Sequence, residues 1–110
     1  MATSTYKVLG QSAPSATTAT TAYTVPSSTQ AVISTIAICN RAATSATYRI
    51  AIRPNGATLA NEHYIAYDAT IAGSDTVFLT VGITIDAADV VTVYASTANT
   101  SFNIFGVEIA

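Results

Sequence analysis

The stretch Ala46-Thr-Tyr-Arg-Ile-Ala-Ile-Arg-Pro54 decides the fold class of this 110-residue chain. Its large apolar side chains, Tyr48, Ile50 and Ile52, all fall on one parity. The positions between them, which include Arg49, carry small or charged side chains. A period of two is typical of a β-strand with one face in a core and the other in contact with solvent. The stretch therefore predicts an amphipathic strand that ends at the turn Pro54-Asn-Gly56.

Other segments of the chain share this composition, which is rich in β-branched and aromatic residues. We expect strands at residues 6–11, 22–25, 30–40, 62–68, 76–85 and 89–95, and around 102–107. Segment 30–40 is apolar on both parities and is predicted to be a central strand. Gly82 is expected to bend or split segment 76–85, and only residues 57–61 have room for a helical turn.

About eight short strands with turn residues between them predict an all-β protein. We expect a single antiparallel β-sandwich of the jelly-roll or immunoglobulin-like kind, with an extended N-terminal segment. Residues 1–21 are expected to form an N-terminal strand or arm and a Ser/Thr/Ala-rich connector, and residues 22–110 the sandwich domain. Such an arm can add a strand to a neighbouring subunit.

Charge is scarce in this chain. Only 9% of the residues are charged, against roughly a quarter in ordinary globular domains. Ala, Thr and Ser together contribute 50 of the 110 residues. Four basic residues are too few for the basic patch that nucleic-acid binding requires. No apolar run approaches the length of about 18 residues that a membrane helix needs. We therefore expect no nucleic-acid partner, no membrane partner and no signal peptide.

Residues for catalysis or metal binding are few. His63 is the only histidine, and no serine lies in a Gly-x-Ser-x-Gly turn. Cys39 is the only cysteine and is expected to be buried and inert. Asp86 and Asp89 share one loop, where we expect them to cap a turn. The sequence predicts no enzyme, no cofactor and no metal site.

Two arginines on the outward parity of segment 46–54 are the best candidates for specific contacts. Arg49 and Arg53 are predicted to pair with carboxylates of the following segments, Asp68 and Asp75, and so to fix register between strands or subunits. The candidate interface residues are Arg49, Arg53, His63, Tyr67 and Asp68. As an alternative, Tyr64, Tyr67 and His63 form an exposed aromatic and polar patch for a receptor or glycan.

A series of segments resembles small virion structural proteins of tailed bacteriophages, including those of cyanobacterial phages. The segments are Thr21–Pro26, Ala31–Thr35, Ile38–Arg41, Tyr48–Pro54, Leu59–Asp68, Leu79–Ile85, Asp89–Ser96 and Phe102–Gly106. The resemblance covers roughly residues 6 to 109. It implies a non-enzymatic β-sandwich that is assembled in the host cytoplasm and built into a virion.

Within that class, we expect a capsid decoration or cement protein that stabilises the head through subunit contacts. Its expected partners are copies of itself, as a homotrimer, and the major capsid protein. The alternative is a tail-fibre or baseplate module that binds a host receptor or glycan. Copy number per virion separates the two, because a head protein is present in hundreds of copies and a tail protein in far fewer.

Overall fold

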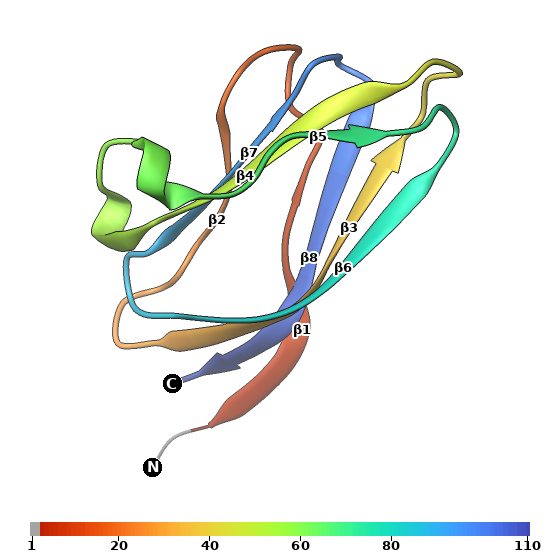
Figure 1. Ribbon diagram of the computed structural model, residues 1–110. Coiled ribbons are helices and arrows are strands. Elements are labelled where there is room, and N and C mark those ends of the chain that lie inside the picture. Colours follow the sequence, from red (N-terminus) through yellow and green to blue (C-terminus); the bar gives the residue numbers. More distant parts are fainter. Residues whose placement is uncertain (1–2) are drawn as a thin grey trace.

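The computed structural model describes residues 3–110, and they form an all-β protein (Figure 1). The strands are β1 (Ser4–Ser12), β2 (Thr20–Thr24), β3 (Gln30–Asn40), β4 (Ala46–Arg53), β5 (Tyr64–Ile71), β6 (Thr76–Ile85), β7 (Val90–Ala95) and β8 (Thr100–Ile109). Two short 3-10 turns, η1 (Pro54–Gly56) and η2 (Asn61–His63), lie between β4 and β5. The predicted fold class, an antiparallel β-sandwich of about eight strands, is confirmed.

The strands form two four-stranded sheets, ordered β1-β8-β3-β6 and β2-β7-β4-β5. Every pairing is antiparallel, and the first strand pairs with the last, the second with the seventh, the third with the sixth and the fourth with the fifth. The chain is thus one long hairpin wound into two layers. This order is that of an eight-stranded jelly roll and differs from the ABED and CFG sheets of immunoglobulin domains.

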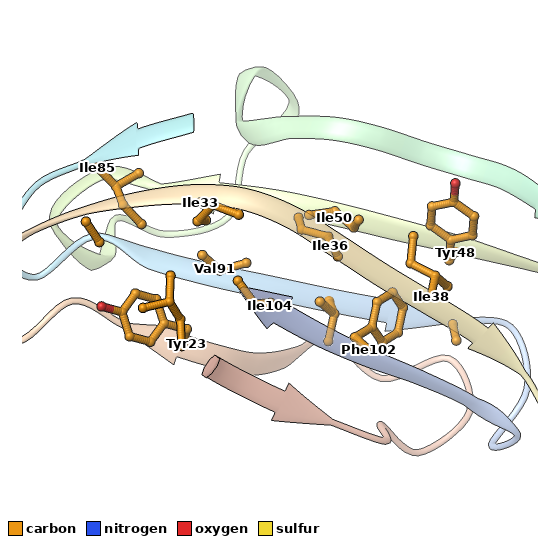
Figure 2. Packing of buried hydrophobic residues seen from close by; sticks show 14 of the residues in the cluster. Tyr23, Ile33, Ile36, Ile38, Tyr48, Ile50, Ile85, Val91, Phe102 and Ile104 are labelled. Atoms are coloured by element: carbon orange, nitrogen blue, oxygen red, sulfur yellow. The ribbon is translucent and has the colours of Figure 1, made fainter. Parts of the chain in front are cut away.

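The core lies between the two sheets and is built by the alternation seen in the sequence. Tyr48 and Ile50 of β4 are buried, as predicted from their parity. They face Ile36, Ile38 and Phe102 from the other sheet, as Figure 2 shows. The rings of Tyr48 and Phe102 meet edge to face with centroids 6.4 Å apart, a favoured aromatic geometry. This contact joins the two sheets toward the end of the sandwich at which β4 and β8 begin.

Of the two effects expected of Gly82, a bend or a split, the split does not occur: β6 is one strand, and its register against β3 is irregular where Val81 and Gly82 stand opposite Ser34. Two local predictions need correction. β5 begins at Tyr64, because Glu62 and His63 belong to the 3-10 turn that precedes it. The helical turn expected at residues 57–61 is replaced by the turns η1 and η2 on either side.

The N-terminal strand is part of the sandwich. β1 pairs with β8 of the same chain over most of its length, and Thr3 and Ala110 exchange two backbone hydrogen bonds. The segment that we expected to reach a neighbour is therefore an edge strand of its own sheet. The connector that follows crosses to the other sheet, where the amide of Thr17 donates to the carbonyl of Ala95 at 2.8 Å.

A buried asparagine ties the loops together at one end of the sandwich. The Asn40 side chain is 1% exposed, and its Nδ2 donates to the carbonyls of Thr44 and Ala72 at 2.9 and 3.2 Å. Its Oδ1 accepts from the amide of Ala42 at 3.1 Å. Asn40 thereby links the β3–β4 loop to the β5–β6 turn, and all its partners are backbone groups that would otherwise be unpaired.

Candidate functional site

Arg49 is the centre of a cluster on the outer face of the β2-β7-β4-β5 sheet. Its Nε and Nη2 donate to the two carboxylate oxygens of Asp68 at 2.7 and 3.2 Å. The guanidinium also lies over the rings of Tyr67 and Tyr94, with its central carbon 4.1 and 4.2 Å from the two ring centroids. Tyr67 in turn meets Tyr64 edge to face at 4.9 Å. Three neighbouring strands therefore hold one planar cation.

A β-bulge makes this arrangement possible. Tyr48 pairs with Ala69 and Ile50 pairs with Ala66, so the two residues Tyr67 and Asp68 stand opposite the single Arg49. Tyr67 supplies an aromatic ring to Arg49, and Asp68 supplies a carboxylate. Asp68 has a φ of 50°, in the left-handed region that aspartate tolerates better than most residues.

The ion pair changes the titration of both partners. The hydrogen bond from Arg49 holds the pKa of the Asp68 carboxyl below its ordinary value, although partial desolvation opposes this. The same hydrogen bond raises the pKa of Arg49 above its ordinary value. Both groups therefore stay charged through the whole neutral range, and their opposite charges cancel locally.

Two small hollows flank Tyr64 on this face. The first, of about 230 Å³, has Arg49, Tyr64, Tyr94 and Thr92 in its lining and Ala51 at its floor; the connector residue Thr17 also borders it. The second, of about 270 Å³, is lined by Asn61, Tyr64 and Tyr67.

The structure brings together only part of the predicted site. Arg49, Tyr67 and Asp68 meet as described, and the predicted Arg49–Asp68 pair is present. Arg53 does not pair with Asp75; it donates to the carbonyls of Gly56 and Ala57 and so fixes the η1 turn. His63 Nδ1 accepts from the amide of Ala60 at 3.0 Å, which orders the η2 turn instead of the cluster.

Tyr94 is the residue of this cluster that sequence reasoning missed. It pairs directly with Arg49 across β7 and β4, and directly opposed residues of an antiparallel pair share a face. Its position on the outward parity of segment 89–95 was visible in the sequence. The register that places it beside Arg49 was not, because the two residues are far apart in the chain.

The other sheet presents a second, very different surface, which we call the uncharged face. It is the outer face of the β1-β8-β3-β6 sheet. It consists of Tyr6, Val8, Gln11, Val32, Thr35, Ala37, Cys39, Thr76, Phe78, Thr80, Thr84, Ser101, Asn103, Phe105 and Val107. No charged side chain stands on this face within residues 3–110.

Large apolar side chains are exposed on the uncharged face. Tyr6, Val8 and Phe78 have 82%, 45% and 67% of their surface in solvent. Phe105 is half-buried on this face, where it pairs with Val8 and Thr35, whereas Ile104 points inward. Cys39, expected to be buried, is half-exposed here.

A further hollow of about 480 Å³ opens near the β6–β7 turn. The two carboxylates that line this hollow accept hydrogen bonds from nearby groups. Asp89 accepts from the backbone amides of Asn55 and Asp86, both at 2.8 Å, and Asp86 accepts from the side-chain amide of Gln30 at 3.0 Å. The capping role predicted for Asp86 and Asp89 is confirmed. Their oxygens are thus committed to the turn.

Residues 3–110 contain no cluster of three or more side chains with the spacing of a metal site. No helix in this part of the chain has the length and apolar character needed to cross a bilayer. The chain matches no known protein family, no curated protein and no solved structure. Fold and surface define its class, an eight-stranded jelly-roll domain with one uncharged face and one aromatic face.

Proposed function

We propose that the protein is a non-enzymatic structural subunit of a tailed-bacteriophage virion, a capsid decoration protein that stabilises the head by subunit–subunit contacts. In this proposal it forms a homotrimer that binds the major capsid protein. The observation that carries the proposal is the uncharged face. The sequence resemblance to phage virion proteins supplies the biological setting.

The size of the uncharged face fits a contact between copies of this chain. Four strands about 4.8 Å apart, each about ten residues long, give a plan area of roughly 600 Å². In a closed ring of three copies the face of each copy packs against the next copy, and each such contact buries roughly 1,200 Å² in total, the lower end of the range for stable protein–protein interfaces. The exposed apolar side chains Tyr6, Val8 and Phe78 are of the kind that mark an interaction surface.

The chemistry of the face also favours a like partner. Exposed sheets normally carry charges that prevent unwanted association, and this one carries Thr, Ser, Ala and aromatic side chains instead. Two copies therefore meet without like-charge repulsion and without leaving a charge desolvated. Phe78 and Val8, on the two edge strands, extend the contact across the full width of the sheet.

The oligomeric state tests the contact directly. Phe78→Lys places a charge on the proposed contact surface, at the most exposed apolar side chain of β6, so light scattering coupled to gel filtration should show a trimer become a monomer. Ile65→Lys is the matched control, because Ile65 is also exposed, at 48%, but lies on β5 of the other sheet. A wild-type monomer at all concentrations, or equal effects of both variants, would overturn the assembly proposal.

Virion experiments test the location. Heads that lack the protein should burst at a lower temperature than complete heads, and restored protein should return the temperature to its original value. Hundreds of copies per particle would agree with a head protein. Unchanged burst temperature, or only tens of copies, would instead favour the second candidate, a tail-fibre or baseplate module that binds a glycan. The aromatic hollows beside Arg49 are the observation that favours this second candidate.

A further inference from the structure

We propose that the outer face of the β2-β7-β4-β5 sheet binds a neutral oligosaccharide in the two hollows beside Tyr64. The binding groups are the rings of Tyr64, Tyr67 and Tyr94 and the guanidinium of Arg49. This site is on the opposite side of the sandwich from the uncharged face, so it stays accessible when that face is covered. It does not depend on whether the protein belongs to a head or a tail.

The shape of the site fits consecutive sugar rings. The two hollows, of about 230 and 270 Å³, share Tyr64 as a common wall. The Tyr64 and Tyr67 rings stand at 84° to each other, so they form a corner that receives a compact ring. A proline-rich peptide instead prefers an extended groove lined by aromatic side chains. One saccharide unit in each hollow makes a disaccharide the smallest full ligand.

The chemistry of the site matches the two kinds of surface that a pyranose presents. C–H groups on the face of the sugar pack against aromatic rings, and hydroxyls at its edge need donors and acceptors in fixed positions. Arg49 uses Nε and Nη2 for Asp68, and within residues 3–110 its Nη1 has no hydrogen-bond acceptor. The amide of Asn61 in the second hollow supplies a further polar group, whereas the hydroxyl oxygen of Thr92 in the first hollow already accepts from Nη1 of Arg53 at 3.4 Å.

The site is pre-organised. The carboxylate of Asp68 and the rings of Tyr67 and Tyr94 fix the plane of the Arg49 guanidinium before any ligand arrives. A side chain that is already ordered loses little conformational entropy on binding, so weak sugar contacts yield measurable affinity.

The charge balance favours a neutral ligand. Asp68 neutralises Arg49, and Arg53 near the first hollow is bound to the carbonyls of Gly56 and Ala57. An acidic sugar or a phosphate would have to compete with Asp68 for the same guanidinium. A neutral saccharide can use Nη1 without breaking that pair.

Titration followed by ¹H–¹⁵N NMR tests the proposal. Maltohexaose, cellohexaose, chitohexaose and mannohexaose are added separately to the intact protein, up to about 10 mM, to detect dissociation constants near 1 mM. At least one should shift the amides of Ala51, Thr92 and Tyr94 and the Arg49 Nε–H. Tyr64→Ala should weaken that binding at least tenfold, and Tyr64→Phe, which keeps the ring, should weaken it less.

Tyr6→Ala is the matched control, since Tyr6 is a highly exposed tyrosine on the uncharged face. It should bind like the wild type, and so should Phe78→Lys, whose loss of assembly would not affect this site. No shift with any of the four saccharides would overturn the proposal. Equal weakening by Tyr6→Ala and Tyr64→Ala, or binding of a poly-proline peptide at this site in preference to all four saccharides, would also overturn it.

Discussion

Tyr23 and Glu108 join the two sheets through a hydrogen bond in which the phenol of Tyr23 donates to Oε2 of Glu108 at 2.6 Å. Tyr23 belongs to β2 and Glu108 to β8, so the bond crosses the sandwich. The second carboxylate oxygen lies 3.1 Å from the ammonium of Lys7 on β1. The Glu108 side chain is only 14% exposed, so both donors hold a largely buried negative charge.

The first prediction concerns acid stability. The hydrogen bonds from Tyr23 and Lys7 hold the pKa of Glu108 below its ordinary value. In the folded state the carboxylate therefore resists protonation, and its stabilising effect is complete above about pH 5 and lost as the pH falls through the folded pKa. Urea denaturation at pH 7 and pH 3 should show the free energy of unfolding falling further in the wild type than in Glu108→Gln. Equal losses would contradict the assignment.

The second prediction concerns Tyr23 at high pH. Burial, followed by the hydrogen bond to Glu108, raises the pKa of Tyr23 well above its ordinary value of 10.0. The stability that Tyr23 supplies is thus complete below pH 10 and lost as the pH rises above the unfolded pKa. Tyr23→Phe should cost about 2 kcal/mol at pH 7, because a hydrogen bond to a charged group is worth more than one between neutral groups. Its stability should then fall less than that of the wild type between pH 9 and pH 11, measured by thermal denaturation.

The third prediction concerns Asn40. Asn40→Ala leaves the carbonyls of Thr44 and Ala72 and the amide of Ala42 without their partner in a buried loop cluster. We expect a loss of about 3 kcal/mol in the free energy of unfolding, because unsatisfied buried groups are costly. Asn99→Ala is the control: Asn99 is exposed in a turn, and its change should lie within about 0.5 kcal/mol. Similar losses in both variants would rule out the special role of Asn40.

The fourth prediction compares two glycines. A Cβ on Gly73 would lie 2.1 Å from the carbonyl oxygen of Ala43, because the β5–β6 turn presses against the β3–β4 loop. A Cβ on Gly82 would meet nothing within 4 Å. Gly73→Ala should therefore lower the melting temperature by several degrees, whereas Gly82→Ala should leave it unchanged or raise it slightly. Calorimetry of the two variants decides the matter, and a tolerated Gly73→Ala would show that the two loops separate easily.

The fifth prediction concerns the Arg49 stack. Aromatic ring currents should move the side-chain protons of Arg49 upfield, because its guanidinium lies over both Tyr67 and Tyr94. Tyr94→Ala should remove part of that shift, while Arg49→Lys should abolish the two-point contact with Asp68. Random-coil proton shifts for Arg49 in the wild type would show that the stack does not persist in solution.

Local signals in the sequence predicted the strands well. Segments 30–40 and 76–85 coincide with β3 and β6, since turn residues bound both segments and both are rich in β-branched residues. The start of β5 was wrong because the contact between His63 and the Ala60 amide, which forms the turn, leaves no trace in hydrophobic periodicity. The faces of β8 could not be assigned for a related reason: the strand is apolar on both parities, so its pattern alone does not say that Ile104 lies inside and Phe105 outside.

The strand order and the surfaces built from distant strands could not be predicted, because they depend on long-range pairing. The sequence suggested a sandwich but left jelly-roll and immunoglobulin-like orders open, since strand order depends on contacts between distant segments. The Arg49–Asp68 pair was within reach because β4 and β5 are consecutive strands. The place of Tyr94 in the cluster could not be predicted in this way. The uncharged face could not be predicted either, because it exists only when β1, β8, β3 and β6 are adjacent.

The wound-hairpin topology determines how long each strand waits for its partner during synthesis. β1 is synthesised before its partner β8, which is the last of the eight strands within residues 3–110. At typical synthesis rates, β1 waits roughly 5 to 20 seconds for that partner. During this interval the β1-β8-β3-β6 sheet cannot close, and Tyr6 and Val8 have no neighbouring strand. The order of the strands thus delays closure of this sheet until β8 has been synthesised, and it leaves the edge residues of β1 exposed until then.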